Sequence, residues 1–183
     1  EMVDGLVGSE RCIRDRSNVT ILEGARIGKN CSVYPGAVIS GVPQDLKFNG
    51  EITTVEIGDN TVVRECVTIN RGTADRNKTV VGKNCLIMAY SHIAHDCLLG
   101  DYCIFSNNST LAGHVTVGDH VTLAGMVAVH QFCKIGRHSF IAGGSLVRKD
   151  IPPYVKAARE PLSFVGINSC LLYTSDAADE RHC

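Results

Sequence analysis

The sequence predicts an all-β fold, a left-handed parallel β-helix of hexapeptide repeats, because three regularities recur along it. An aliphatic or Phe residue falls at every sixth position, the residue after it is usually Gly or Ala, and the residue four places after it is small. A helical period of about 3.6 residues fits none of these spacings. The aliphatic series that keeps one unbroken phase is Val81, Ile87, Ile93, Leu99, Phe105, Leu111, Val117, Leu123, Val129, Ile135, Ile141 and Val147.

Each hexad reads as one short strand followed by one corner. Strand side chains alternate with a period of two, so the small residue and the next aliphatic residue, two places apart, both point inward. Gly, Asn and Asp at the intervening positions tolerate the backbone angles of a tight corner. Three hexads, 18 residues, are expected to close a triangular coil. Parallel connections are usually right-handed, and hexapeptide solenoids are the known left-handed exception.

The same phase continues upstream, so one β-helix domain is predicted over residues 18–169. Interruptions near 40–56 and 70–80 leave the phase intact and predict two loops that protrude from the regular body. The stretches 1–17 and 170–183 do not follow the repeat and resemble translated cloning or adapter sequence, so we expect a non-native leader and a non-native tail. The upstream aliphatic positions are Ile21, Ile27, Val33, Ile39, Ile57, Val63 and Ile69.

Composition indicates a cytoplasmic protein with a substantial core. The chain has 183 residues, 44% of them hydrophobic, and a formal net charge of −1, which argues against general nucleic-acid binding because that requires a basic surface. No apolar run approaches the roughly 20 residues that span a bilayer, and we find no signal peptide. The nine cysteines include no CxxC pair, so structural zinc is not expected. Packing thiols are predicted at the small inward position, at Cys31, Cys85, Cys97, Cys103 and Cys133.

Two histidines stand out as candidates for chemistry. His92 and His95 are both predicted to point outward, close together, and His95 is followed by Asp96. A neutral imidazole takes a proton from a hydroxyl near pH 7, and a carboxylate orients the ring. His95 is therefore a candidate general base, with a polar surface residue as the alternative. Other histidines, at 114, 120 and 138, fall at outward corner positions, where a polar residue is expected anyway.

An open solenoid surface lacks a second wall for a pocket, so a homo-oligomer with sites between subunits is expected. The loop around Asp45 and Lys47 is long enough to reach a neighbour and to bind a polar or phosphorylated ligand; a solvated charged loop is the alternative. A basic C-terminal region predicts either a docking patch for an acidic partner or ordinary surface charge. Its cations are Lys134, Arg137, Arg148, Lys149, Lys156 and Arg159.

Several segments in this order resemble the UDP-N-acetylglucosamine O-acyltransferases that open lipid A biosynthesis, members of the hexapeptide-repeat acyltransferases. The resemblance covers residues 18–169, and INRGT and PPYVKAAREP look most like members from Bacteroidetes-type bacteria. Single hexads are generic, whereas the VPQDLKF loop followed by the two histidine segments is highly specific. The matching stretches are VPQDLKF (42–48), TVEIGDN (54–60), ECVTINRGT (65–73), LIMAYSHIAHDC (86–97), LAGHV (111–115), AVHQFCKIG (128–136) and DIPPYVKAAREPLSFVGINS (150–169).

The resemblance implies transfer of an (R)-3-hydroxyacyl group from acyl carrier protein to the 3-hydroxyl of UDP-N-acetylglucosamine. It implies that His95 is the catalytic base, Asp96 its partner acid, and the Gly125 N–H the oxyanion donor. It implies a homotrimer that uses no metal and no cofactor, because the acyl group arrives on the phosphopantetheine of the carrier protein. Substrate binding is assigned to Gln44, Asp45, Lys47, His92, His114, His130, Gln131, Gly143 and Asn168.

The sequence also departs from the family pattern. Asn70 stands where many members have His, and the acid and Arg that follow the position of Asn168 in the family are absent. The family's C-terminal helical domain is expected to be missing, which leaves the activity of this chain an open question. Gly143 matches the position that limits acyl length in the family. Because glycine has no side chain to close the groove, a long acyl chain is expected to fit.

Three other functions remain open. A related UDP-sugar N-acyltransferase acts on an amine, and the VPQDLK loop argues against it. A γ-class carbonic anhydrase-like zinc enzyme uses the same fold with three histidine ligands between subunits. A purely structural solenoid needs no paired outward histidines. The acyl chain length, and the choice between N-acetylglucosamine and a 3-amino analogue, are left open as well.

Overall fold

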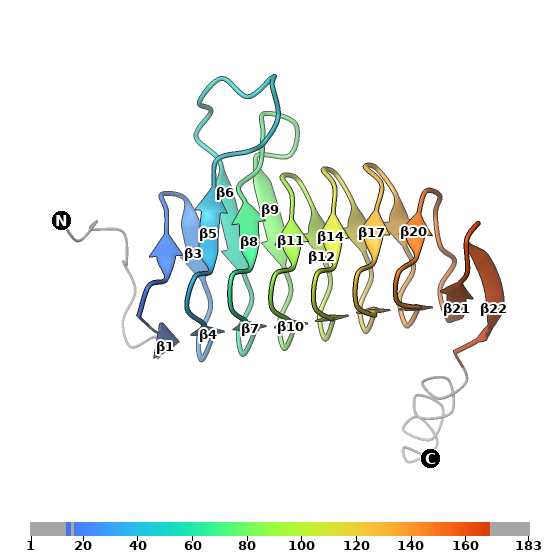
Figure 1. Ribbon diagram of the computed structural model, residues 1–183. Helices are drawn as coiled ribbons and strands as arrows, with labels where there is room; N and C mark the ends of the chain where they lie inside the picture. Colours follow the sequence, from blue (N-terminus) through green and yellow to red (C-terminus); the bar gives the residue numbers. More distant parts are fainter. Residues whose placement is uncertain (1–13, 16, 169–183) are drawn as a thin grey trace, which may run out of the picture.

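The computed structural model describes residues 14, 15 and 17–168, which form a triangular solenoid of short strands stacked in coils (Figure 1). All the strands pair in parallel except the last two. Together with the hexapeptide repeat, this is the predicted left-handed parallel β-helix. Among the described residues no helix is long and apolar enough to cross a membrane.

Three sheets form the sides of the triangle, each built from every third strand until the last two strands of the chain, which both join the first sheet. The first sheet contains β1 (Arg14–Asp15), β4 (Ser32–Val33), β7 (Val62–Val63), β10 (Leu86–Ile87), β13 (Ile104–Phe105), β16 (Thr122–Leu123), β19 (Phe140–Ile141), β21 (Val155–Ala158) and β22 (Ser163–Ile167). The second contains β2 (Thr20–Ile21), β5 (Val38–Gly41), β8 (Thr68–Asn70), β11 (His92–Ile93), β14 (Thr110–Leu111), β17 (Ala128–Val129) and β20 (Leu146–Val147). The third contains β3 (Ala25–Ile27), β6 (Thr54–Ile57), β9 (Lys78–Val81), β12 (Leu98–Leu99), β15 (Thr116–Val117) and β18 (Lys134–Ile135).

The register shows why the repeat keeps its phase across both loops. In the regular coils each residue pairs with one 18 positions on, as Ile87 does with Phe105. Across the first loop, between β5 and β6, the offset is 30, as for Ile27 and Ile57, and across the second, between β8 and β9, it is 24. The loops therefore insert 12 and 6 residues, whole hexads that return the chain to the same face of the coil. Both protrude from the body, as Figure 1 shows.

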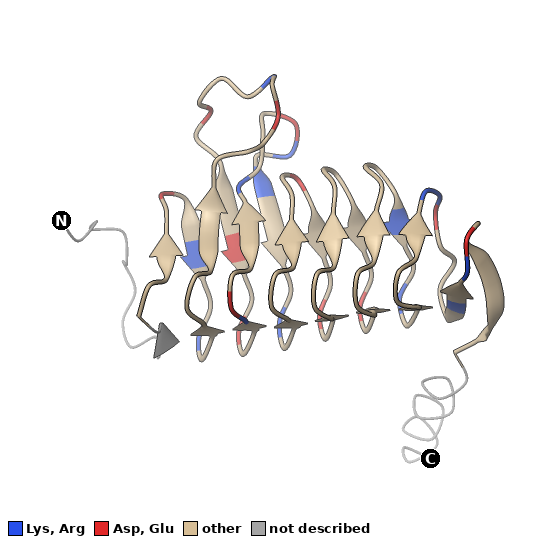
Figure 2. Ribbon diagram, in the orientation of Figure 1, with Lys and Arg blue, Asp and Glu red and all other residues tan. Residues whose placement is uncertain are grey.

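The core is the column of inward residues that the repeat predicts. The predicted aliphatic positions from Ile27 onward are buried, with Phe105 fully enclosed at the centre, and Ile21 in the first coil packs partly buried against them. The five predicted packing cysteines are buried as well. Burial raises the pKa of the Cys97 thiol to about 12, so this thiol stays protonated and acts as a small apolar side chain. Charged residues lie instead in the corners and loops and on a few strands, such as Glu56 on β6 and Lys78 on β9, which are not buried (Figure 2).

Three corners connect the sheets: the first corner leads from the first sheet to the second, the second corner from the second to the third, and the third corner back to the first. At the third corner the residue with positive φ is Asn in the early coils and Tyr or His later. Because coils repeat at about the spacing of stacked rings, Tyr102, His120, His138 and Tyr154 form a ladder with ring centroids 4.6–5.0 Å apart. His120 and His138 are therefore accounted for by stacking at a corner.

The ends of the solenoid differ from the simple repeat. Arg14–Asp15 already pair with β4 at the 18-residue offset, whereas nearly all of the expected leader and the whole of the expected tail lie outside the described residues. At the other end β21 and β22 form an antiparallel hairpin that the hexad pattern did not predict. Its turn contains Glu160–Pro161, and proline, which has no N–H, cannot continue a parallel ladder.

Candidate active site

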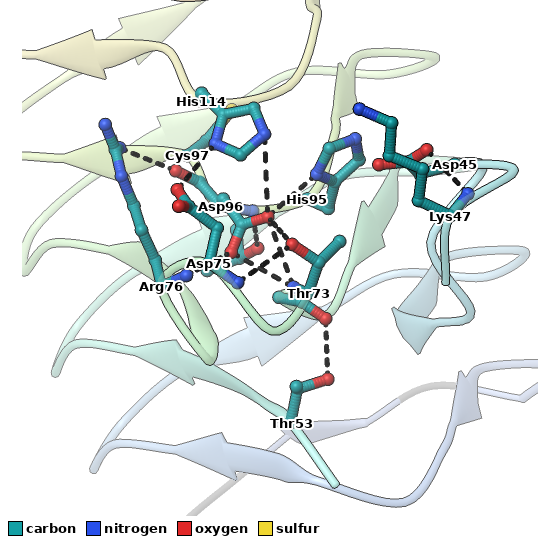
Figure 3. Close-up of polar contacts among 12 residues, drawn as sticks. Asp45, Lys47, Thr53, Thr73, Asp75, Arg76, His95, Asp96, Cys97 and His114 are labelled. Carbon is teal, nitrogen blue, oxygen red and sulfur yellow. Dashed lines mark hydrogen bonds and ion pairs between the residues drawn. The ribbon is translucent and has the colours of Figure 1, made fainter. Parts of the chain in front are cut away.

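The candidate site lies at the second corner, where Ala94, His95, Asp96 and Cys97 connect β11 to β12. Both protruding loops leave the solenoid at this same corner, because each joins a strand of the second sheet to one of the third. The segment 71–77 lies over the backbone at Asp96, and the loop 42–53 lies beyond it (Figure 3). The corner thus has walls that the regular coils lack.

His95 and Asp96 form a buried pair. His95 Nδ1 lies 2.8 Å from Asp96 Oδ2, and the side chain of Asp96 is inaccessible to solvent while that of His95 is 11% exposed. Asp96 has φ of +58°, a left-handed conformation that Asp and Asn adopt more readily than other residues with side chains. The corner geometry therefore turns the carboxylate back onto the preceding imidazole.

The carboxylate of Asp96 accepts hydrogen bonds from several donors besides His95. The Thr73 hydroxyl donates to Oδ2 at 2.6 Å, the Thr73 N–H to both oxygens at 3.0 and 3.2 Å, and the Arg76 N–H to Oδ1 at 3.2 Å. Burial alone raises the pKa of Asp96, but the hydrogen bonds from Thr73, His95 and Arg76 outweigh it and hold this pKa below its usual range. Asp96 is ionised at neutral pH.

An ionised carboxylate only accepts hydrogen bonds, and this determines the tautomer of His95. Nδ1 of His95 must carry the proton that it donates to Asp96 Oδ2. In the neutral ring the lone pair is then on Nε2. His95 is held as a base whose free nitrogen points away from its carboxylate.

His114 packs against this pair from the next coil. Its ring meets the His95 ring edge-on, with centroids 5.0 Å apart, and stacks on Phe132 at 4.6 Å. Its Nδ1 lies 3.2 Å from Asp75 Oδ2 without hydrogen-bond alignment. His114 is thus a partly buried wall of the site rather than a solvated corner residue.

Gly113 packs directly against the imidazole ring of His95, whereas Gly125 does not. A Cβ at Gly113 would lie 2.6 Å from His95 Cε1 and 2.7 Å from Nε2, and no described residue accepts a hydrogen bond from the Gly113 N–H. Gly125 lies at the first corner, beside Gly143 and the Asn107 carbonyl. Within one chain Gly125 therefore lies at a different corner from His95, whereas Gly113 lies beside it, and the oxyanion role expected of Gly125 stays a prediction.

A cavity of about 330 Å³ joins the first loop to the second corner. It brings together Asp45 and Lys47, predicted as ligand contacts, with His114. Gln44 is exposed on the same loop. The remaining lining residues are Glu51, Thr73, Ala74, Asp75 and Phe132. Carboxylates, a cation and an aromatic ring in one hollow suit a polar ligand that has hydrogen-bond donors.

Other predicted site residues lie at varying distances from the pair. His92 is on β11, three residues before His95 in the same coil, and its Nδ1 lies 2.7 Å from the Thr68 hydroxyl oxygen. Burial, with a smaller contribution from the charge on His95, holds the pKa of His92 below its usual range, so His92 is a neutral neighbour. His130 and Gln131 are exposed in the coil beyond Gly113.

Asn168, Gly143 and Asn70 have other surroundings. The Asn168 amide donates to the His138 carbonyl at 2.9 Å, so within one chain it ties the terminal hairpin to the third corner and does not reach His95. Gly143 is exposed at the first corner. The amide nitrogen of Asn70 donates to the Val42 carbonyl at 2.9 Å, which anchors the first loop.

The site was also tested as a metal centre. His95, Asp96 and His114 present ligand atoms within 4.8 Å of one another. The Asp96 oxygens already accept from Thr73 and Arg76, and an N–H pointing at an oxygen occupies the lone pair that a cation needs. In the described part of the chain this cluster has two histidines, not the three of a γ-class zinc site. The arrangement suits acid–base chemistry better than metal binding.

Sequence reasoning missed three contributors to this site. Thr73 and Arg76 lie in an insertion that carries no periodic signal, and Gly113 reads as one more corner glycine. A signal for Gly113 was available, because it is 18 residues from His95 and so occupies the same position one coil later. Nothing in the pattern indicated which way the segment 71–77 would turn.

Comparison with known proteins agrees with the repeat. Residues 78–113 match the family model described as bacterial transferase hexapeptide (six repeats). An acyl-[acyl-carrier-protein]–UDP-N-acetylglucosamine O-acyltransferase of Rhizobium rhizogenes is 48% identical over 153 residues, which are 83% of this chain and 56% of that protein. The chain thus spans little more than half the length of this relative.

Solved structures extend the comparison. The UDP-N-acetylglucosamine acyltransferase of Bacteroides fragilis matches with a TM-score of 0.87 and 47% identity, covering 89% of this chain and 64% of that one. The enzyme of the same name from Campylobacter jejuni matches with a TM-score of 0.73 and 35% identity, covering 85% of this chain and 75% of that one. With this identity over three quarters of a relative's length, the chain belongs to the family of UDP-N-acetylglucosamine acyltransferases.

Proposed function

We propose that the protein transfers an acyl group from acyl carrier protein to the 3-hydroxyl of UDP-N-acetylglucosamine, the first step of lipid A biosynthesis. The observation that carries this proposal is the pairing of His95 with a buried, ionised Asp96 at 2.8 Å. This pairing holds Nε2 free to take a proton from a hydroxyl. The names of the relatives, O-acyltransferases that use acyl carrier protein, supply the two substrates.

The geometry supports a direct transfer. His95 Nε2 removes the proton of the sugar hydroxyl as its oxygen attacks the thioester carbonyl, and Asp96 stabilises the imidazolium that forms. The tetrahedral intermediate then collapses, the carbon–sulfur bond breaks, and the imidazolium returns the proton to the departing thiol. Neither a metal nor a covalent enzyme intermediate takes part in these steps.

The developing oxyanion needs a donor beside the base. We assign this role to the N–H of Gly113, because Gly113 packs against the His95 ring and its N–H has no acceptor among the described residues. One such donor is typically worth about 10²–10³ in rate. A side chain at this position would occupy the space that the reacting groups need.

The first loop supplies binding of the sugar nucleotide. Lys47 and Asp45 line the cavity beside His114, where an ammonium group pairs with phosphate and a carboxylate accepts from sugar hydroxyls. Gln44, exposed on the same loop, adds an amide that both donates and accepts. Placing nucleotide here puts the sugar at the second corner, next to His95.

Two further partners complete the proposal. The second corner has walls only from its own loops, and large apolar side chains are exposed on other corners, with Tyr90 63% and Met126 70% exposed. A homotrimer would cover such side chains and close the site. Sedimentation velocity, which measures the size of the assembly, tests whether the trimer forms.

The carrier protein would dock by its acidic surface on the basic C-terminal region, which includes Lys149 and Lys156.

An acyl-transfer assay tests the function. The protein is incubated with 3-hydroxyacyl carrier protein and UDP-N-acetylglucosamine, and the ester product is followed by mass spectrometry. His95→Ala should lower kcat by about 10³-fold or more, because it removes the base. His120→Ala, a histidine of the third-corner ladder, is the matched control and should retain kcat. Product formation that is equal in the two variants would rule out the assigned base.

A further inference from the structure

The segment 71–77 makes contacts to Asp96 that a simple connecting loop does not need. Besides the bonds to the carboxylate, the Arg76 guanidinium donates to the Asp96 carbonyl at 2.7 Å. On β9 of the preceding coil, Thr79 Oγ1 accepts a hydrogen bond from the Asp96 N–H at 2.9 Å. Figure 3 shows the contacts of Thr73, Arg76 and His95 converging on Asp96. Backbone and side chain of Asp96 are thus held from both sides.

Thr73 contributes the shortest of these bonds. Its hydroxyl lies 2.6 Å from Asp96 Oδ2, the same oxygen that His95 Nδ1 reaches at 2.8 Å. Thr73 is buried, and water has little access to replace the bond. A hydrogen bond to a buried charged group is among the stronger ones in proteins.

The direction of the bond follows from the partners of the hydroxyl. Asp75 N–H donates to Thr73 Oγ1 at 3.3 Å, and the ionised carboxylate of Asp96 only accepts. The single hydroxyl proton of Thr73 must therefore point at Asp96. The backbone beside it is anchored too, since the Thr53 hydroxyl donates to the Gly72 carbonyl at 2.6 Å.

We propose that Thr73 is a positioning residue, which orients the Asp96 carboxylate so that Oδ2 faces His95 Nδ1 and keeps Nε2 as the free nitrogen. The inference rests on the proposed function for its kinetic consequence but not for the tautomer it predicts. Without the hydroxyl the carboxylate rotates to satisfy other donors, and the imidazole loses the acceptor that selects its Nδ1–H form.

Two substitutions of Thr73 separate its role in orienting Asp96 from a general contribution to folding stability. Thr73→Val removes the hydroxyl and keeps the branched shape, and Thr73→Ser restores the hydroxyl. Thr61→Val is the matched control, because Thr61 is also buried and donates to a carbonyl, that of Gly82 at 2.8 Å, but at the third corner. Loss of stability common to both Val variants is thereby separated from effects on the site.

The first measurement needs no substrate. The protein is labelled with ¹⁵N in its histidine rings, and the His95 signal is assigned by its absence in His95→Ala. Near pH 8 the wild type, Thr73→Ser and Thr61→Val should show the Nδ1–H tautomer. Thr73→Val should show a substantial Nε2–H population. A Thr73→Val protein that is folded and retains the Nδ1–H tautomer would overturn the proposal.

The second measurement is kinetic. Thr73→Val should lower kcat about 10- to 100-fold with KM for both substrates nearly unchanged, Thr73→Ser should restore most of kcat, and Thr61→Val should leave it intact. In an Asp96→Asn background Thr73→Val should have little further effect, because it acts through Asp96. Full additivity of the two losses would overturn the proposal. A wild type that transfers no acyl group would refute the proposed function, while the tautomer still decides the role of Thr73.

Discussion

At the scale of single residues, Asp96 combines requirements that few side chains meet. Its φ of +58° favours Asp, Asn or Gly, its burial requires partners for a charge, and those partners come from a segment 20 to 23 residues earlier in the chain. The result is an ionised carboxylate packed against an imidazole. Asp96 therefore fits the backbone of the corner and also accepts the hydrogen bond that orients the His95 ring.

The first prediction concerns pH and stability. Because the pKa of Asp96 is lowered in the folded state, the stabilisation it brings is present above the unfolded pKa of about 3.9 and is lost as pH falls through the lower folded pKa. Asp96→Asn has no such charge but tolerates the same backbone. Urea unfolding should therefore show a gap in unfolding free energy between wild type and Asp96→Asn at pH 6 that narrows toward pH 3. A gap that stays constant with pH contradicts this assignment.

A second prediction compares two glycines. Gly113→Ala places a Cβ within 2.7 Å of His95 ring atoms and should lower kcat by about 10²-fold or more. Gly125→Ala meets only the Asn107 carbonyl at 3.5 Å, an ordinary contact, and should retain activity. Circular dichroism checks that both variants fold. The reverse order of the two activities would return the oxyanion role to Gly125.

At the scale of elements, the two insertions are joined to each other and to the solenoid by hydrogen bonds that fall outside the hexad repeat. Asn70 links the end of β8 to the Val42 carbonyl, Thr53 links the first loop to Gly72, and Arg71 lies over the Phe48 ring at 5.6 Å. The first loop, which carries Asp45 and Lys47, and the segment 71–77 are therefore fastened to each other. The loop proposed to bind nucleotide and the segment that donates to Asp96 are thus held by the same hydrogen bonds.

The third prediction releases this support at one point. Asn70→Ala removes the bond to the Val42 carbonyl and should speed amide hydrogen exchange in residues 43–49 by about 10-fold. KM for UDP-N-acetylglucosamine should rise while kcat changes less, since Asp96 keeps its hydrogen bonds from Thr73 and Arg76. Asn107→Ala, at the exposed first corner, is the control. Unchanged exchange in the loop would show that Asn70 does not anchor it.

The hexads were predictable from sequence because each inward position reports on packing alone. The buried series through Phe105 and the coil spacing follow from counting residues, and even the insertions keep the count by adding whole hexads. Of the candidate site, the sequence predicted the pair His95 and Asp96 on the hexads and the loop residues Asp45 and Lys47. Thr73 and Arg76 reach Asp96 through loop geometry that no period encodes, and the hairpin β21–β22 arises where the repeat ends.

At the scale of the whole molecule, the solenoid repeats one coil along its length, and both insertions leave it at the second corner. Each coil contacts only its neighbours, so most of the chain repeats a stable unit, and stacked ladders such as Tyr102 and His120 reinforce the third corner. The candidate site lies at the second corner, where residues of both insertions line a cavity beside His114. The scaffold thus holds the His95–Asp96 pair at a corner that is set off from the regular coils.

If His95 Nε2 receives the proton of a sugar hydroxyl at this corner, the sugar must bind within hydrogen-bond distance of it. A crystal structure of the protein with UDP-N-acetylglucosamine bound would show this. We expect the sugar 3-hydroxyl oxygen about 3 Å from His95 Nε2, with the diphosphate near Lys47. Sugar bound elsewhere, for example in the hollow between Glu23 and Arg71 on the other side of the first loop, would contradict it.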